Sequence, residues 1–161
     1  MSKNEMMIPN VRVKVNKIYH DIYKDLTQSS NIRKPVIDGH GKVFILCASL
    51  GYEYDKRVPF NKGEGKPLFW SHSMTNHDPI ILYSIALFSK GKVNYDILSQ
   101  PEEVIKIVEE YANGGMEILM DEVLEPYVKK NNDMYYLDYS KSSFLEKDIL
   151  SFINEYKNKS P

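Results

Sequence analysis

The chain has 161 residues, of which 42% are hydrophobic and 27% charged, a composition typical of a globular protein with one core. Cys47 is the only cysteine, which excludes an intramolecular disulfide and a cysteine-based zinc cluster. The longest nearly apolar runs have about ten residues, whereas a membrane span needs about twenty, and the N-terminus lacks the pattern of a signal peptide. We therefore expect a cytoplasmic protein without membrane contact.

The net charge of −1 is unevenly distributed along the chain. Residues 1–70 carry 12 Lys and Arg against 7 Asp and Glu, and residues 71–161 carry 9 against 15. A basic half permits contact with nucleic acid. The same asymmetry permits head-to-tail association of copies into a homo-oligomer. A charge asymmetry of this size also arises by chance.

Residues 1–15 are predicted to form an N-terminal arm, in which three valines alternate with Arg12 and Lys14 as in a short strand. Apolar residues then recur at helical spacing, which predicts a first helix over residues 12–29.

The most apolar stretch, Val43 to Tyr52, predicts a second helix. It would start near Lys42, after Asp38 as an N-cap, and end at Gly51 as a left-handed C-terminal residue. A buried strand is the alternative for so short a run. Residues 52–78 are predicted to be a long central loop. Four residues interrupt regular structure in this loop: Pro59, Gly63, Gly65 and Pro67.

The C-terminal half is also predicted to be helical. The segment from Ile80 to Phe88 is apolar on almost every side, which is typical of a central, covered helix. A fourth helix is predicted to break sharply at Asn113-Gly114-Gly115, and a fifth to follow until Pro126 kinks or ends it. After a turn at Asn131-Asn132-Asp133, a last helix is predicted over 144–157. The expected fold is therefore all-α, a single-domain bundle of about six helices spanning residues 1–161.

Few residues have the spacing of a catalytic or metal site. His72 and His77 lie five positions apart, whereas helical metal-binding pairs lie four apart, and no third ligand accompanies them. Cys47 lies in an apolar run, where a thiol is usually inert. Phosphate-binding glycine motifs are missing. We predict no catalytic residue, no metal and no cofactor.

Cations interleaved with aromatic residues follow the second predicted helix. Lys and Arg beside aromatic rings can hold phosphates and stack on bases. Arg57 precedes Pro59, and a stiffened backbone there would orient its guanidinium toward a phosphate or carboxylate. The alternative is an internal ion pair of Arg57 with Glu109 or Glu110. The predicted DNA- or partner-binding residues are Lys42, Lys56, Arg57, Lys62, Lys66 and Trp70.

Two parts of the chain resemble a known family. They are Phe44–Gly51 followed by Lys56–Phe60, and Glu109–Met116 followed by Leu119. These segments resemble the DNA phosphorothioation-associated protein 4 family, small proteins found alongside Dnd-type DNA sulfur-modification and restriction genes. The resemblance spans roughly residues 38–125. Its matching positions are Gly51, Arg57, Pro59, Glu110, Tyr111, Asn113 and Gly114.

That resemblance implies a prokaryotic anti-phage defence setting and an accessory role, with structural or binding roles for the matching positions and no catalytic residues. Three functions compete. The first is a non-enzymatic protein that binds DNA or other proteins of the defence system through the region from Lys42 to Trp70. The second is a structural adaptor, a middle component of a multi-gene ATPase complex, which would expose an apolar patch on its last two helices. The third, a small nuclease, lacks the D…E-x-K spacing of such enzymes.

Overall fold

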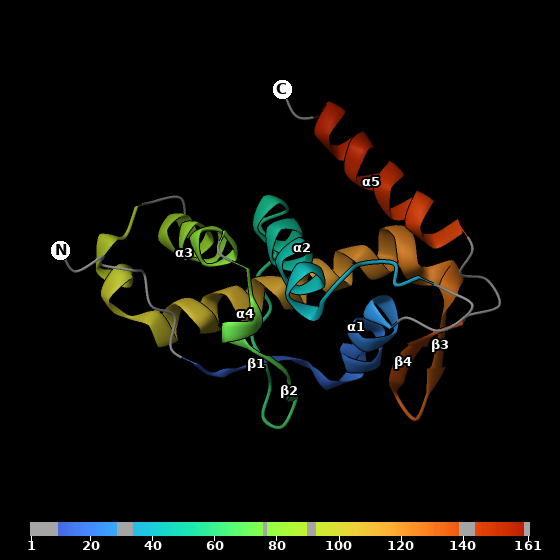
Figure 1. The fold of residues 1–161 in the computed structure, drawn as a ribbon, viewed down its shortest axis with the longest axis horizontal. Coiled ribbons are helices and arrows are strands. Elements are labelled where there is room, and N and C mark those ends of the chain that lie inside the picture. The colour runs from blue at the N-terminus through green and yellow to red at the C-terminus, as the bar shows by residue number, and fades with distance from the viewer. Residues whose placement is uncertain (1–9, 29–33, 76, 90–92, 139–143, 160–161) are drawn as a thin grey trace.

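The computed structural model describes residues 10–28, 34–75, 77–89, 93–138 and 144–159. Within them the chain forms five α-helices and two two-stranded antiparallel sheets, so the predicted all-α fold is wrong (Figure 1). The elements in chain order are β1 (Arg12–Asn16), α1 (His20–Thr27), α2 (His40–Glu53), β2 (Gly65–Trp70), α3 (Asp78–Phe88), α4 (Pro101–Leu119), β3 (Val128–Asn131), β4 (Met134–Leu137) and α5 (Leu145–Lys159).

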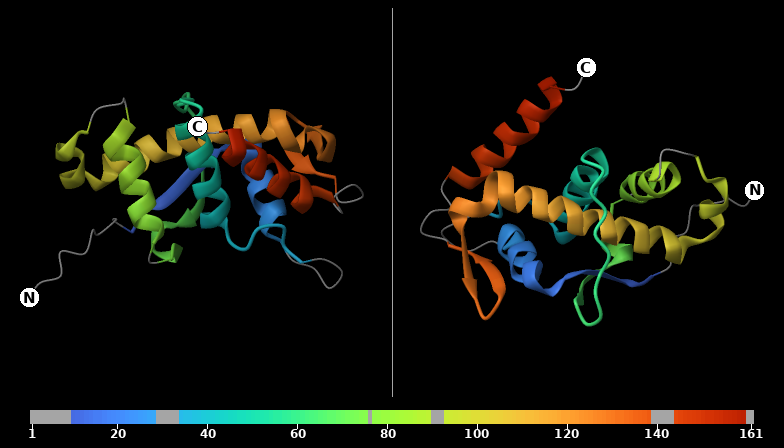
Figure 2. Two further views of the ribbon diagram at one scale, coloured as in Figure 1. Left: turned by 90° about the horizontal axis from the view of Figure 1, so that it is seen from above. Right: turned by 180° about the vertical axis from the view of Figure 1, so that it is seen from behind.

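Helix α4 is the axis of the molecule. It contacts α2, α3 and β1, while α1 packs between α2 and the β3–β4 hairpin (Figure 1). Buried residues occur along nearly the whole length of α4. Its Met116 and Leu119, together with Phe44 of α2, are fully buried. Helix α5 rises away from the end of α4 in Figure 1, and the left view of Figure 2 shows it lying over the body; its Tyr156 contacts Tyr54 and Glu53 at the end of α2. Burial of this shared apolar cluster is the main force that holds the elements together.

Helix α4 runs without interruption through the predicted break at Asn113-Gly114-Gly115, so the break is wrong. Gly51, predicted to end the second helix, lies inside α2 instead. The reason is packing: a methyl group at Gly51 would lie 1.9 Å from the Tyr111 carbonyl oxygen, and one at Gly115 would lie 1.6 Å from the Cys47 carbonyl oxygen. The glycines allow the two backbones to touch, and tertiary contact outweighs their low helix propensity.

Helix α2 begins two residues earlier than predicted and excludes the strand alternative. Its N-cap is Gly39, with a φ of 100°, and Asp38 does not cap it. Only a residue without a Cβ adopts this backbone conformation readily, so the glycine rather than the carboxylate sets the start.

The N-terminal segment contains a short strand, as the valine alternation predicted, at the place where the overlapping first helix was predicted to begin. Residues 12–16 form β1, a 3-10 turn follows over Lys17–Tyr19, and only His20–Thr27 are α-helical. Strand β1 pairs antiparallel with β2, with Arg12 opposite Trp70. The predicted loop 52–78 therefore contains a strand. Pro67 lies where the register shifts, and this two-stranded ribbon has edges that tolerate its missing N–H.

Two predictions for the C-terminal part are confirmed, the turn and the last helix, whereas the β3–β4 hairpin was not predicted. The turn at Asn131-Asn132-Asp133 joins β3 to β4, and Asn132 and Asp133 have φ values of 50° and 64°, as a tight two-residue hairpin requires. Residues 120–124 continue α4 as a π-helical segment, and a 3-10 turn at Glu125–Tyr127 ends it at Pro126. The last predicted helix is α5, but a separate fifth helix after Gly115 is not formed.

Helix α3 is not the covered central helix that its composition predicts. Leu82, Tyr83 and Ala86 face the core, whereas Ile80 is 56% exposed and Phe88 is 45% exposed. One apolar face of α3 is therefore open to solvent. Across the described residues, every helix is too short or too polar to cross a membrane.

Candidate nucleic-acid interface

The β1–β2 ribbon has one apolar and one basic face. Val13 and Val15 of β1 are buried, because alternate side chains of a strand point to opposite sides. Leu68 and Phe69 of β2 are adjacent and both buried, because the register shifts between Val13 and Lys14 and leaves Leu68 as an extra residue in β2. This inner face packs on α4 and α2, and Phe69 meets the Phe44 ring edge-on at 5.5 Å. The opposite face of the ribbon therefore points away from α2 and α4.

Positive charge is concentrated on and around the ribbon. Arg12 and Lys14 lie on its outer face, Lys66 lies opposite Val15 but is exposed, and Lys17 and Lys62 are exposed at the ends of the connecting segment. Within the described part of the chain, none of the five forms an ion pair. Trp70 is 48% exposed, and the Arg12 guanidinium carbon lies 5.2 Å from its ring centroid. Five exposed cations and the Arg12–Trp70 stack thus lie on or beside the ribbon.

The one carboxylate in this ribbon does not neutralise it. Glu64 accepts a hydrogen bond from the Asn61 amide at 2.6 Å and one from Asn16 Nδ2 at 3.4 Å. Its backbone carbonyl also accepts from the Lys17 amide at 2.8 Å. Glu64 therefore shapes the connection between the strands and leaves the lysines without a counter-ion.

A buried carboxylate of α4 fixes β1 in place. The Lys14 backbone N–H donates to Glu109 Oε2 at 2.6 Å. Burial raises the pKa of Glu109 to about 7, although this hydrogen bond and the Lys14 charge oppose the shift. The predicted alternative of an Arg57–Glu109 ion pair is not formed, because Glu109 faces the ribbon.

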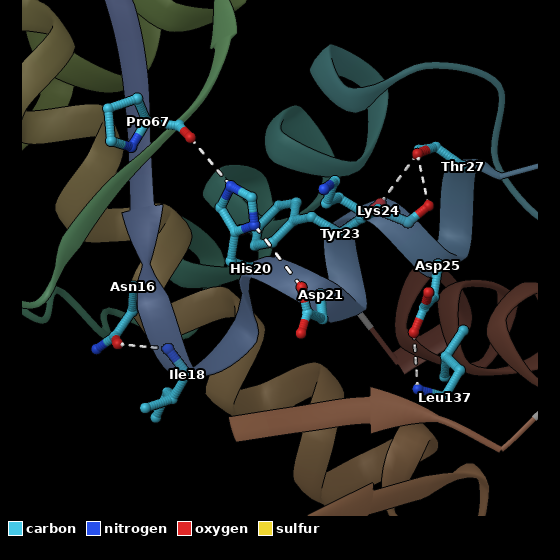
Figure 3. A network of polar contacts seen from close by, with 10 residues as sticks. All are labelled: Asn16, Ile18, His20, Asp21, Tyr23, Lys24, Asp25, Thr27, Pro67 and Leu137. Atoms are coloured by element: carbon cyan, nitrogen blue, oxygen red, sulfur yellow. Dashed lines mark hydrogen bonds and ion pairs between the residues drawn. The ribbon is translucent and has the colours of Figure 1, made fainter. Parts of the chain in front are cut away.

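Helix α1 anchors the other strand. His20 Nε2 lies 3.0 Å from the Pro67 carbonyl oxygen, and Figure 3 shows this bond reaching from α1 to β2. Burial lowers the pKa of His20; the bond to Pro67 opposes this, and the Lys66 charge adds to it. The ring is therefore neutral at pH 7 and acts as a donor to the backbone. Asn16 caps the turn that precedes α1 through the Ile18 amide.

Two of the predicted binding cations are used internally. Lys42 Nζ lies 3.1 Å from both Asp78 Oδ1 and Thr75 Oγ1. Burial alone would raise the pKa of Asp78, but hydrogen bonds from Thr75 and Lys42 outweigh it and lower the pKa. Lys56 Nζ lies 2.8 Å from Glu117 Oε2. Both lysines join α2 or its C-terminal extension to other elements.

Arg57 forms the internal ion pair that was the alternative to ligand binding. Its Nε donates to Glu110 Oε2 at 2.5 Å, and its guanidinium carbon lies 5.9 Å from the Tyr111 ring centroid. The Val58 amide donates to the Glu110 carbonyl at 3.0 Å, and Asn113 Nδ2 donates to the Val58 carbonyl at 3.0 Å. The segment after α2 is thus fastened to one side of α4.

The seven positions of the resemblance meet at this place, which we call the α2–α4 junction. Gly51 and Gly114 allow backbone contact, since a methyl group at Gly114 would lie 1.9 Å from the Lys56 carbonyl oxygen. Pro59 follows the Val58 carbonyl that Asn113 holds. Two segments about 50 residues apart in sequence therefore form one contact. No described residue at the junction pairs the Arg57 terminal nitrogens.

Among the described residues, no side chains are arranged for metal binding or for thiol chemistry. No group of three or more His, Cys, Asp and Glu there is placed to hold a metal ion. Cys47 is fully buried, and burial raises the pKa of its thiol to about 12. The thiol is therefore protonated and out of contact with solvent.

The sequence interpretation missed Arg12, Lys14 and Lys17 as members of the basic surface. The alternation of valines with Arg12 and Lys14 held the signal, because it places both cations on one face of a strand. The predicted helix over residues 12–29 would instead have placed these cations on different sides of a helix. Of the predicted residues, Trp70 lies opposite Arg12, Lys66 belongs to β2, and Lys62 lies just before β2 in the chain.

Comparison with known proteins agrees with the resemblance. The family model described as DNA sulphur modification system-associated protein 4 matches residues 12–151, which include the β1–β2 ribbon and the α2–α4 junction. Neither the curated proteins nor the solved structures contain a match to the chain. The chain belongs to the DNA sulphur modification system-associated protein 4 family.

Proposed function

We propose that this chain is a non-enzymatic accessory protein of a Dnd-type DNA sulphur modification system, and that it binds DNA through the outer face of the β1–β2 ribbon. The observation that carries the proposal is the set of five exposed cations on and around the ribbon, which have no ion-pair partner among the described residues. Association of the family with DNA modification makes DNA the partner that fits this charge.

The ribbon has features that favour a nucleic-acid backbone. Cations that lack a protein counter-ion can replace the ions condensed on DNA, and release of those ions drives binding. A two-stranded ribbon is narrow enough to enter the major groove. Trp70 adds a flat surface that suits an unpaired base, with Arg12 already stacked on it.

Fluorescence anisotropy with labelled duplex DNA, plain and phosphorothioated, tests the proposal across a salt series. We expect the wild type to bind at low salt and Arg12→Glu with Lys66→Glu to lose at least about a hundredfold in affinity. The matched control is Lys129→Glu with Lys130→Glu on the β3–β4 hairpin, where the lysines already face Asp138 and Asp133.

The control should bind nearly as the wild type does. Absence of wild-type binding at low salt would contradict the proposal, as would equal losses in the two variants. A preference for the phosphorothioated duplex would extend the proposal to readout of the modification itself.

The adaptor function is a second candidate, and the exposed face of α3 favours it. Ile80, Ile81 and Phe88 lie on this face, which has no charged residue between Pro79 and Phe88. Its one polar residue, Ser84, donates its hydroxyl to the Ile80 carbonyl at 2.7 Å. A face with no charge and no free donor fits an uncharged apolar helix face of another protein of the system.

Co-purification with the other proteins of the system tests this candidate. Ile80→Glu with Phe88→Glu should abolish capture, because burying two carboxylates in an apolar contact is costly. Met134→Glu on β4 is the control, since Met134 is an exposed apolar residue of the β3–β4 hairpin, outside α3 and outside the last two helices where the sequence predicted the patch. Capture unchanged by the α3 variant, or a wild-type homodimer dissolved by it, would contradict the adaptor function.

A further inference from the structure

A cavity of about 350 Å³ lies beside the α2–α4 junction, and the proposed function does not use it. It opens where the end of α3, the 3-10 helix η4 (Tyr95–Ser99) and the first turns of α4 meet. Its wall combines apolar side chains, among them Ile97 and Ile107, with the polar residues Arg57, Asn94, Gln100 and Glu103. Such a volume, apolar with a few polar groups, is within the range of small-ligand sites.

Arg57 is held in place at this wall, but only some of its N–H donors have partners. Glu110 occupies its Nε, and the Tyr111 ring lies beside the guanidinium. A guanidinium has five N–H donors, and among the described residues its terminal nitrogens have no acceptor. The side chain is 28% exposed. A planar, fixed fork with free donors is suited to a carboxylate or phosphate in bidentate contact.

The neighbouring groups decide between these anions. The Asn94 side-chain oxygen already accepts from the Asp96 amide at 3.2 Å, which leaves its NH₂ to donate to a ligand oxygen. Glu103 also lines the cavity, and a carboxylate accepts hydrogen bonds. An anion alone would leave Glu103 without a donor, whereas a carboxylate whose own molecule carries a neighbouring N–H donor would satisfy both Arg57 and Glu103.

We infer that the cavity binds an amino-carboxylate group, with the carboxylate on the Arg57 terminal nitrogens, the N–H donor on Glu103 and the side chain toward Ile97 and Ile107. A free amino acid and the C-terminal residue of a peptide both present this chemistry. The site is separate from the ribbon, so it stands or falls independently of DNA binding.

Amide and arginine-side-chain NMR spectra of the full chain test the inference with four probes. L-Alanine carries the carboxylate and an ammonium group, N-acetyl-L-alanine carries the carboxylate and an amide, L-alaninamide lacks the carboxylate, and inorganic phosphate is the second anion. We expect saturable shifts of the Arg57 Hε and of amides around the cavity with one or both carboxylates. Tighter binding of alanine indicates a free amino acid, and tighter binding of N-acetylalanine indicates a peptide C-terminus.

Two variants define the contacts. Arg57→Lys keeps the charge but loses the fork, and should weaken binding of either carboxylate at least tenfold. Glu103→Gln should weaken alanine about tenfold and N-acetylalanine much less, since only the ammonium group needs the charge. Glu102→Gln is the matched control, because Glu102 is the exposed neighbour outside the cavity wall. Equal shifts with alaninamide or phosphate, no saturable shift with either carboxylate, or equal effects of the two glutamate variants would overturn the inference.

Discussion

The β1–β2 ribbon and the α2–α4 junction use cations from the same part of the sequence in opposite ways. At the junction, Lys56 and Arg57 each meet a carboxylate of α4. On the ribbon, Lys62 and Lys66 are exposed and have no such partner within the described residues. The difference is that α4 places carboxylates beside Lys56 and Arg57 but none within ion-pair distance of Lys62 and Lys66. A count of the charges nearby in the sequence does not reveal this. Junction variants should therefore change the free energy of unfolding, and ribbon variants should change DNA affinity.

The largest expected effect is on the junction. Gly115→Ala would place a methyl group 1.6 Å from the Cys47 carbonyl oxygen, so α2 and α4 must separate. We expect at least about 3 kcal/mol lower stability in urea unfolding, or no folded protein. Gly41→Ala is the control in α2, where the nearest atom would be Met74 Cγ at 3.5 Å. The control should be neutral or up to about 1 kcal/mol more stable; equal behaviour of both variants would contradict the close contact.

A smaller effect is expected from breaking the Arg57 ion pair. Glu110→Gln leaves a partly buried guanidinium without its carboxylate, and we expect about 2 kcal/mol lower stability, less than for a fully buried pair because Arg57 is 28% exposed. Glu117→Gln removes the partner of Lys56 in a more exposed pair and should cost less than about 1 kcal/mol. Urea unfolding compares the two. Equal costs would show that the junction pair is no stronger than a surface pair.

The smallest effect links α4 to the ribbon through pH. Burial raises the pKa of Glu109 in the folded chain to about 7, above the 4.5 of an unfolded glutamate. Its protonation therefore stabilises the fold fully below about pH 4.5, and this contribution is lost as pH rises through about 7. Melting temperatures between pH 5 and 8 should fall more steeply for the wild type than for Glu109→Gln, by a few degrees. Parallel profiles would show that Glu109 is not held in this buried state.

Local patterns in the sequence predicted elements whose signal needs no distant partner. The apolar stripe of the last helix and the turn at Asn131-Asn132-Asp133 are confirmed, because periodicity and turn chemistry act over a few residues. An ion pair of Arg57 with Glu109 or Glu110 was the alternative to ligand binding, and the structure contains the pair with Glu110.

The predictions that the structure contradicts have a common physical cause, which is contact between residues far apart in the sequence. Gly114 and Gly115 would break a solitary helix, but they are retained because α2, about 60 residues earlier, lies against them. Strand β2 contains Gly65 and Pro67, which disfavour a strand until β1 supplies a partner. Recognition of β1 would have required choosing the valine alternation over an overlapping helical stripe.

The salt dependence of DNA affinity tests the central claim most directly, because it counts the phosphates that cations neutralise. We would compare Arg12→Gln with Lys66→Gln on the ribbon and Lys56→Gln with Lys129→Gln at paired positions, since both variants remove two charges. The account predicts that the slope of log K against log salt falls by about 2 for the ribbon variant and stays unchanged for the paired variant, with about 0.9 per phosphate. Melting temperatures confirm that the ribbon variant is folded. Equal slopes in both variants and the wild type, or an equal decrease in both, would contradict the claim that the ribbon binds DNA.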